Sequence, residues 1–275
     1  MKFVRYSKPG RAEGMGVYSD GRVTDLSHSY DEFEDMLEDA DNTRLPARGV
    51  KVDNSDLLPP VSRTSKILCM AINYRSHIDE RHTVQTKEPI LFTKFYSSLT
   101  GPYSEIPRFT VSKIMDYEGE IAVVIGKRAK NVKRSKAWDH VLGYTLLNDM
   151  SARSLFRVPQ GDGAMLDWFS CKTIDRSTPV GPWVVTKDEA GDFARLRIET
   201  FLNGSKVQSG DPSDMVFDVP KVIEHVSSRV SLEAGDIIST GTPAGVGESR
   251  KRTLEKGDVV RVQAEGIGHL ENKIV

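Results

Sequence analysis

The chain of 275 residues is long enough to bury a sizeable hydrophobic core, and its 38 basic and 39 acidic residues leave a net charge of −1. This balance argues against a nucleic-acid or membrane-surface partner. No apolar run approaches the roughly 20 residues of a membrane span, and the first residues lack the shape of a signal peptide. The two cysteines, Cys69 and Cys171, are far apart in the sequence and fit a reduced cytoplasmic protein.

Residues 1–60 are predicted to form a small separate α+β domain. Residues 2–6 alternate as a strand does, and Asp20-Gly21 is a strong hairpin signal between two further strands. Ser29 is expected to cap a helix that runs to about Asp39. Pro59-Pro60 blocks both helix and central strand and ends the unit, so that residues 61–275 form the second domain.

A histidine and a glutamate follow the strand expected at residues 65–70. His77 and Glu80 are three positions apart and would share one face of a helix. A carboxylate that orients an imidazole makes a general base, although a charge-rich surface helix would show the same pattern. The next expected strand, residues 88–95, carries Lys94, which could meet a substrate carboxylate, the acidic cluster described next, or only a salt-bridge partner.

Alternating acids precede the most apolar strand of the sequence. Residues 121–125 are a β-branched run that predicts a buried strand. If that strand extends back to Asp116, the period of two places Asp116, Glu118 and Glu120 on one face, with the Cα atoms of the last two roughly 7 Å apart. Such acids either face water at a strand end or share a cation.

A third carboxylate favours the cation. The apolar run at residues 142–148 ends on Asp149, which a buried strand would hold rigidly. Two carboxylates from one strand and one from the next give an oxygen-only ligand set, which suits Mg²⁺, with Mn²⁺ or Ca²⁺ as alternatives. Arg153 follows on the first turns of an expected helix at residues 151–157, where it could bind a substrate carboxylate or pair with the acidic cluster.

The rest of the chain is predicted to contain mostly strands and turns. Residues 158–165 are expected to form a flexible loop. Asn203-Gly204 marks a hairpin after the strand at residues 196–202. An apolar stripe from Val219 to Val230 predicts a helix with His225 on its exposed side. The glycine- and threonine-rich residues 240–247 lack the Gly-Lys-Ser/Thr of a phosphate-binding loop, but would let a ligand approach the backbone.

Several of these motifs, in this order, resemble the fumarylacetoacetate hydrolase superfamily. The resemblance covers roughly residues 61–275, and one departure is Cys171-Lys172-Thr173, where related sequences often have Gly-Lys-Ser. The motifs are Ala71-Ile72-Asn73-Tyr74-Arg75-Ser76-His77, Asp116-x-Glu118-x-Glu120, Asn148-Asp149-x-Ser151-Ala152-Arg153, Cys171-Lys172-Thr173, Thr178-Pro179-Val180-Gly181-Pro182-Trp183 and Ser239-Thr240-Gly241-Thr242-Pro243.

The resemblance implies a fold, a set of site residues and an activity. The fold would be α+β, with a large mixed β-roll or barrel of the family's C-terminal type after the small N-terminal domain, and the protein would be a homodimer. Mg²⁺ would be held by Glu118, Glu120 and Asp149. His77, Glu80 and Lys172 would be catalytic, and Tyr74, Arg153 and Thr242 would bind substrate.

The implied reaction is hydrolysis of a C–C bond in a 2,4-diketo acid, with a metal-bound enolate as the leaving fragment. Alternatives at the same site are decarboxylation of a β-keto acid such as oxaloacetate and isomerisation of a hydroxymuconate-type dienoate in aromatic catabolism. A protein that binds metal and organic acid without turnover is the alternative of another class.

Overall fold

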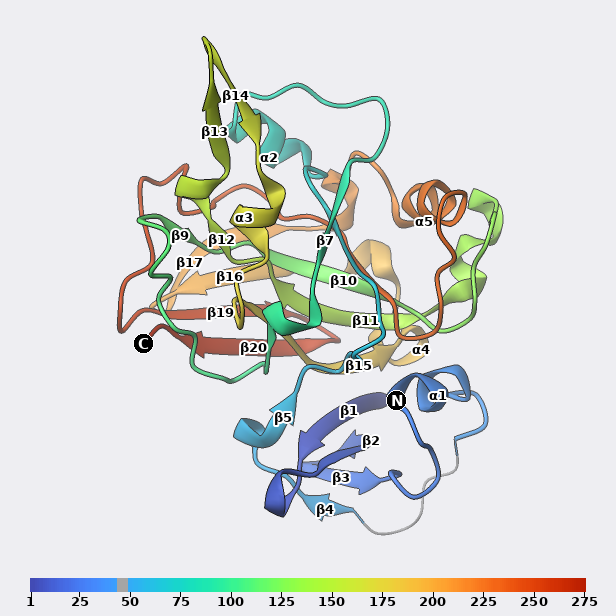
Figure 1. The fold of residues 1–275 in the computed structure, drawn as a ribbon. Helices are drawn as coiled ribbons and strands as arrows, with labels where there is room; N and C mark the ends of the chain where they lie inside the picture. The colour runs from blue at the N-terminus through green and yellow to red at the C-terminus, as the bar shows by residue number, and fades with distance from the viewer. Residues whose placement is uncertain (44–48) are drawn as a thin grey trace.

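The computed structural model describes residues 1–43 and 49–275, and strands dominate it (Figure 1). The larger of its sheets has twelve strands, and its main path runs β4-β3-β2-β1-β15-β11-β10-β18-β6-β7. In that order the bounds are Val50–Lys51, Arg22–Asp25, Glu13–Ser19, Lys2–Ser7, Thr178–Thr186, Val141–Asn148, Gly119–Ile125, Ile237–Ser239, Ile67–Met70 and Leu91–Lys94, with β5 (Leu57–Leu58) beside β1 and β8 (Leu99–Thr100) beside β15.

A second sheet and short helices complete the architecture. The second sheet has four strands in the order β17 (Ser205–Gly210), β16 (Ile198–Leu202), β19 (Val259–Ala264) and β20 (Gly268–Lys273). The helices are α1 (Phe33–Glu38), α2 (Arg75–Glu80), α3 (Trp168–Lys172), α4 (Lys187–Ala190) and α5 (Val219–Ser227). The predicted sheet-dominated α+β class is confirmed. The larger sheet is mixed, because β18 pairs with β6 and β15 with β8 in parallel, and its path stays open between β4 and β7.

Strand β10 is buried on both faces because it separates two apolar cores. Ile121, Val123 and Ile125 belong to the core that includes Val262 and Leu270 of the four-stranded sheet and the apolar face of α5. Ala122 and Val124 point to the other core, which β1, β15 and α1 share. The sequence of a strand that is buried on both faces is a continuous run of apolar residues, as residues 121–125 are.

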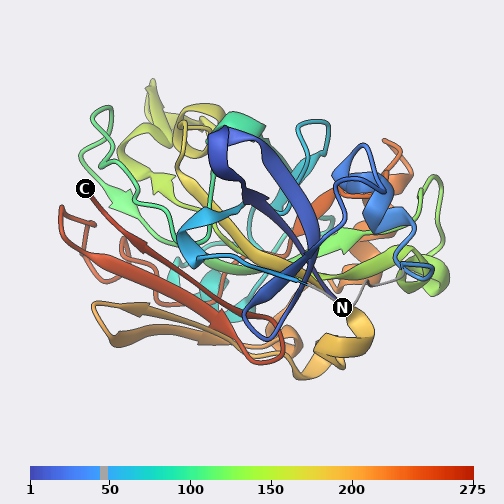
Figure 2. The same ribbon diagram turned by 90° about the horizontal axis from the view of Figure 1, so that it is seen from below.

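The first 60 residues extend the larger sheet. Strand β1 pairs with β2 on one side and with β15 on the other, and Figure 2 shows β1 and β2 (blue) crossing the near side of the molecule. Asp20 and Gly21, both with positive φ, form the predicted hairpin turn between β2 and β3. The division of the chain at residue 60 stays a prediction.

The predicted helix at residues 29–39 begins later than expected. The amide of Ser29 donates to Leu26 O within a turn, and α1 starts at Phe33. Glu32 and Asp35 form a reciprocal capping box that fixes the start.

The segment after Asp149 was predicted wrongly as helix and then loop. Ser151–Ala152 is strand β12, which pairs with β9 (Met115–Asp116), and only Arg153–Leu155 forms a turn of 3₁₀ helix. Residues 158–165 lie in a β-hairpin of β13 (Arg157–Gln160) and β14 (Gly163–Leu166). The alternation that marks a strand is weak there because every residue of both strands is exposed.

Two smaller expectations about α5 also differ from the structure. The side chain of His225 is only 11% exposed, and its Nδ1 lies 3.3 Å from Glu88 Oε2. The helix ends at Ser227, so Val230 is outside it and exposed. Among the described residues, no helix has the length and apolar character needed to cross a membrane.

Candidate functional site

The antiparallel pairing of β10 with β11 brings three carboxylates together. Gly119 faces Asn148, and the amide of Asp149 donates to Glu118 O at 2.8 Å. Glu118, Glu120 and Asp149 therefore converge, with one oxygen of each within 4.8 Å of the others. Gly119 is needed between the two glutamates, since a Cβ atom there would lie 2.2 Å from Thr200 Oγ1 of the second sheet.

Two buried lysines border this acidic cluster. Lys172 Nζ donates to Glu118 Oε2 at 2.8 Å and to Asp149 Oδ2 at 2.6 Å. Lys94 Nζ lies 2.7 Å from Asp149 Oδ1 without hydrogen-bond geometry, and donates to Thr178 Oγ1 and to Lys172 O. Burial alone would lower the pKa of Lys172, but Asp149 and Glu118 raise it above its ordinary value. The lysine therefore stays charged at the cluster.

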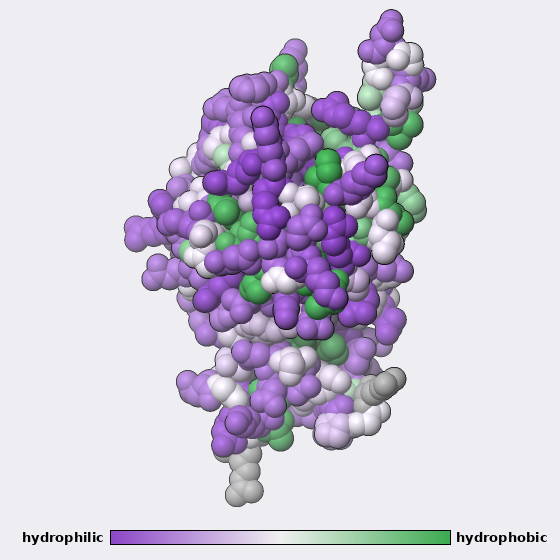
Figure 3. Space-filling model, turned by 90° about the vertical axis from the view of Figure 1, so that its left-hand side faces the viewer, coloured by the Kyte–Doolittle hydropathy of each residue, from purple (hydrophilic) through white to green (hydrophobic). Residues whose placement is uncertain are grey.

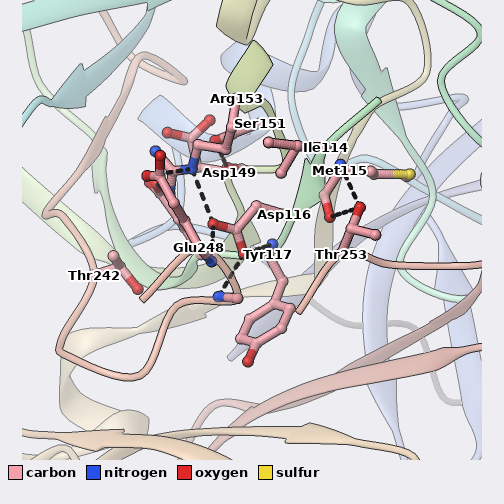
Figure 4. Close-up of polar contacts among 12 residues, drawn as sticks. Ile114, Met115, Asp116, Tyr117, Asp149, Ser151, Arg153, Thr242, Glu248 and Thr253 are labelled. Atoms are coloured by element: carbon pink, nitrogen blue, oxygen red, sulfur yellow. Dashed lines mark hydrogen bonds and ion pairs between the residues drawn. The ribbon is translucent and has the colours of Figure 1, made fainter. Parts of the chain in front are cut away.

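Arg153 contacts the carboxylates, which is one of the two roles considered for it (Figure 4). Its Nε donates to Asp116 Oδ2 at 2.9 Å and its Nη2 donates to Glu118 Oε1. Burial would raise the pKa of Glu118, but the positive charges of Arg153 and Lys172 outweigh burial and hold that pKa below its ordinary value. Glu118 is therefore ionised.

The expectation that Asp116 shares the face of Glu118 and Glu120 is wrong. The strand is interrupted at Tyr117 and Glu118, so β9 and β10 are separate. Asp116 instead accepts hydrogen bonds from the amides of Gly247 and Glu248 (2.6 and 3.1 Å) and from Arg153. It anchors the arginine and the turn at residues 245–248, and lies outside the cluster.

Glu120 is held from the neighbouring strand. Its Oε2 accepts hydrogen bonds from Ser239 Oγ at 2.5 Å and from the amide of Gly241 at 2.9 Å. Its Oε1 is buried and has no hydrogen-bond partner in the part of the chain that the structure describes. Burial, followed by the charges of Asp149 and Glu118, raises the pKa of Glu120 well above its ordinary value.

The donor set fits a hard divalent cation. Among the described residues, three carboxylates converge at the cluster and neither a sulfur nor an imidazole belongs to it. Glu120 Oε1, which accepts no hydrogen bond from them, is an oxygen available for coordination. A cation there would also remove the cost of keeping Glu120 ionised beside two other acids. The residues that would hold it are Glu118, Glu120 and Asp149, as the sequence predicts.

His77 and Glu80 form a pair on α2. His77 Nδ1 lies 3.3 Å from Glu80 Oε2, while Glu80 Oε1 accepts from the amide of Gly245 at 2.8 Å. Burial would raise the pKa of Glu80, but the hydrogen bonds from His77 and Gly245 lower it overall. A charged Glu80 holds the Nδ1 proton in place, which leaves His77 Nε2 as the basic nitrogen.

The predicted substrate residues Tyr74 and Thr242 belong to the segments that hold this pair. Tyr74 is the N-cap residue of α2, and Thr242 is in the turn whose Gly245 amide binds Glu80. Thr242 Oγ1 donates to Gly119 O and accepts from Gln208 Nε2, both at 2.8 Å, so its hydroxyl fixes the turn at residues 240–247 against β10. Tyr74 is fully buried, and its hydroxyl makes no hydrogen bond with any described residue. Their roles toward a substrate stay predictions.

Sequence reasoning missed the groups that hold the cluster from other strands. Ser239 and the amide of Gly241 hold Glu120, and Asp116 holds Arg153. Ser239 lies 119 residues from Glu120, and only the pairing of β18 with β10 brings them together. The available signal was the glycine- and threonine-rich run at residues 240–247, which indicated a turn near a ligand but not that its first residues hold Glu120.

The comparisons with known proteins identify the family. The model of the fumarylacetoacetate (FAA) hydrolase C-terminal domain matches residues 66–275. The chain belongs to this family. It is 43% identical over 293 residues to a human mitochondrial oxaloacetate tautomerase, a match that covers 100% of this chain and 92% of that protein.

Solved structures of the family have the same fold. A fumarylacetoacetate hydrolase of Exiguobacterium antarcticum superposes with a TM-score of 0.83 at 35% identity, covering 100% of this chain and 99% of that one. A maleylpyruvate hydrolase of Sphingobium sp. SYK-6, solved with manganese(II) and pyruvate, superposes with a TM-score of 0.77 at 26% identity, with coverage of 100% and 99%. The chain is therefore a member of an enzyme family that includes tautomerases and hydrolases.

Proposed function

We propose that this protein is a divalent-metal-dependent enzyme that tautomerises a 2-oxo acid of the oxaloacetate type. The observation that carries the proposal is the convergence of Glu118, Glu120 and Asp149 beside charged Lys172, with the His77–Glu80 pair on the adjoining segment. The 43% identity to an oxaloacetate tautomerase over the whole chain supports the reaction type.

Glu118, Glu120 and Asp149 would hold the cation, with Mg²⁺ as first choice and Mn²⁺ or Ca²⁺ as alternatives. When bound, the cation acts as a Lewis acid that polarises the 2-oxo group and orients the substrate. Lys172 Nζ hydrogen-bonds Glu118 and Asp149, and its third N–H can donate to an oxyanion formed beside them.

Tautomerisation needs one proton to leave carbon and one to reach oxygen. His77 Nε2 takes the proton from C3 of the keto acid, and Glu80 stabilises the imidazolium that results. Lys172 hydrogen-bonds the oxygen on which the negative charge develops. The protonated His77 gives this proton to that oxygen, so the enol forms with no net gain or loss of protons and without consuming water, and the reverse reaction uses the same groups.

Hydrolysis of an acylpyruvate is the second candidate, and the same histidine pair favours it. An imidazole oriented by a carboxylate can activate water for attack on the 4-keto carbon, which would release pyruvate as its enolate. The resemblance of the fold to a maleylpyruvate hydrolase is consistent with this reaction. Decarboxylation or dienoate isomerisation at the same cluster, and binding without turnover, remain outcomes of the test.

A substrate panel with Mg²⁺ or Mn²⁺ separates these reactions by product. Enol oxaloacetate, keto oxaloacetate, an acylpyruvate and a hydroxymuconate are each incubated with the protein, with a chelator as control. The expected result is fast loss of the enol signal of oxaloacetate without release of pyruvate. Faster release of pyruvate from oxaloacetate would establish a decarboxylase. Faster cleavage of the acylpyruvate would establish a hydrolase. If no compound is turned over, the protein is a binding protein.

The projecting hairpin of β13 and β14 supports the homodimer implied by the family resemblance. We define the arm as residues 157–166; it stands out from the body of the protein (Figures 1 and 3). A two-stranded hairpin with both faces in water is marginally stable, yet this one exposes Val158 (48%), Met165 (61%) and Leu166 (47%). Phe169 of α3 is 66% exposed at its base. This apolar surface is suited to burial against another protein.

The charges of the arm are complementary to those of a second copy. Arg157 is at the base and Asp162 is at the tip, and both are exposed. A two-fold axis that pairs two arms antiparallel would place each Asp162 near the Arg157 of the other copy. We propose that two chains associate through this arm in solution.

The cytoplasmic location stays a prediction.

We expect the double substitution M165D/L166D to convert the dimer into monomers, because it places four charges in a symmetric apolar contact. Light scattering after size exclusion measures the mass. V50D is the matched control, since Val50 is also exposed (52%) but lies in β4 at the opposite end of the molecule. A monomeric wild type, or an arm variant that stays dimeric, would contradict the proposal.

A further inference from the structure

The turn at residues 245–248 lies between the two halves of the proposed catalytic machinery. On one side it meets the segment that leads into the carboxylate cluster, where Asp116 accepts hydrogen bonds from the amides of Gly247 and Glu248 at 2.6 and 3.1 Å. A Cβ atom at Gly247 would lie 2.6 Å from Asp116 Oδ1, so this close approach requires glycine. The turn is therefore fixed to the chain beside the cluster.

On its other side the same turn holds the end of helix α2. The amide of Gly245 donates to Glu80 Oε1 at 2.8 Å, and Arg81 Nη1 donates to Glu248 Oε2. Gly245 is itself held in place, because the buried hydroxyl of Tyr117 donates to its carbonyl oxygen at 3.0 Å. One contact with α2 is thus made by the backbone of the turn, and the other is an ion pair between side chains.

Helix α2 depends on such contacts because it has only six residues. A helix of this length is unstable by itself in water. Its N-terminal end is anchored by the buried side chain of Asn73, whose Nδ2 donates to Phe217 O and Thr240 O at 3.0 and 2.9 Å. Its C-terminal end continues into residues 82–85, which are all exposed. The contacts with the turn therefore hold the end of the helix that carries the His77–Glu80 pair.

The carboxylate of Glu248 links the two halves directly. The oxygen that accepts from Arg81 also lies 3.7 Å from Arg153 Nε, and Arg153 in turn donates to Glu118 of the cluster. Figure 4 shows Glu248 beside Asp116 and Arg153. The side chain of Arg81 is 16% exposed and that of Glu248 is 39% exposed, so the solvent screens this ion pair only in part.

We propose that Arg81 and Glu248 are positioning residues that set the place of His77 relative to a substrate held at the carboxylate cluster. A general base must lie within hydrogen-bond reach of the proton that it takes, and a small displacement of a catalytic group lowers the rate of the chemical step. The ion pair acts through His77 and exchanges no proton with the substrate. This inference rests on the proposed function, because that function makes His77 the base.

The first test measures kcat for oxaloacetate and the affinity for oxalate in the presence of Mg²⁺. Arg81→Gln and Glu248→Gln should each lower kcat about 3- to 10-fold, because the base is displaced but present, and should leave oxalate affinity unchanged. The double variant should be no slower than the slower single variant, since both remove the same contact. Arg81→Lys keeps the charge and should stay close to the wild type. Glu255→Gln is the control, because it removes a similarly exposed ion pair with Arg108 elsewhere on the surface.

The second test measures hydrogen exchange of the backbone amides and does not depend on turnover. The amides of Arg81 and His82 donate to His77 O and Asp79 O at the end of α2. They should exchange about 2- to 5-fold faster in Arg81→Gln and in Glu248→Gln, the effect of losing one partly exposed ion pair, and at the wild-type rate in Glu255→Gln.

The two tests separate this inference from the proposed function. A wild type that tautomerises oxaloacetate, with both glutamine variants equal to it in kcat and in amide exchange, would overturn the inference alone. Losses of kcat that multiply in the double variant, or that come with an equal loss of oxalate affinity, would also overturn it. A wild type without turnover would reject the proposed function, and the role of His77 with it.

Discussion

Glu118→Gln and Asp149→Asn are each expected to abolish metal-dependent turnover while the chain still folds. Each change removes one anionic oxygen ligand from a cluster of three, and keeps the size of the side chain. Removing a group that only hydrogen-bonds a metal ligand typically lowers metal affinity or activity about 10- to 100-fold. Loss of a direct ligand should therefore exceed about 100-fold.

Metal binding itself is measured by the shift of melting temperature between chelator and millimolar Mg²⁺. A cation that binds only the folded state adds about 2.7 kcal/mol to the free energy of unfolding at 100 times its Kd. The wild type should show this shift and both variants should lose it. Asp236→Asn is the control, because Asp236 is equally buried but contacts Lys66 in a different turn. Wild-type metal affinity and turnover in both cluster variants would remove the metal assignment.

His77→Ala is expected to lower kcat by about 10² to 10⁴, the usual range for a general base. Oxalate, a non-reactive analogue of a 2-oxo acid, should bind the variant as tightly as the wild type, because its affinity depends on the cation and not on the imidazole. Turnover of oxaloacetate and of an acylpyruvate is measured in parallel with oxalate affinity. The same loss of kcat is expected for tautomerisation and for hydrolysis, because both proposed reactions use His77 for proton transfer.

His82→Ala serves as the comparison, because His82 lies just beyond α2 and is exposed. It should retain full activity. Simple decarboxylation requires no base, so a His77→Ala variant that loses little activity on oxaloacetate while releasing pyruvate would indicate a decarboxylase. Wild-type rates of tautomerisation and of acylpyruvate cleavage by His77→Ala would show that the proposed role of the histidine is wrong.

The central strands could be predicted from the sequence because local patterns determine them. The apolar runs ending at Ile125 and Asn148 became β10 and β11, and the two-residue spacing of Glu118 and Glu120 placed both carboxylates in one cluster with Asp149. The three-residue spacing of His77 and Glu80 likewise produced a contact on one short helix. Each of these contacts depends on strand or helix geometry or on one adjacent strand pair.

The remaining features depend on contacts between distant segments. Asp116 satisfied the same alternation as Glu118, but a break in the strand turned it toward Arg153 and the turn at Gly247. The arm could not be recognised because the alternation that reveals a strand comes from burial on one face, and both faces of β13 and β14 are exposed. The sequence left several possible partners for Lys94, and the fold places its ammonium group against Asp149.

The most direct test of the proposed function is the rate at which the enol form of oxaloacetate disappears in the presence of the protein and Mg²⁺. The rate should rise in proportion to protein concentration, return to that of buffer with excess chelator, and stay at that of buffer for Asp149→Asn. A wild-type rate no faster than buffer, or one that chelation and Asp149→Asn leave unchanged, would contradict a metal-dependent tautomerase at the Glu118, Glu120 and Asp149 cluster.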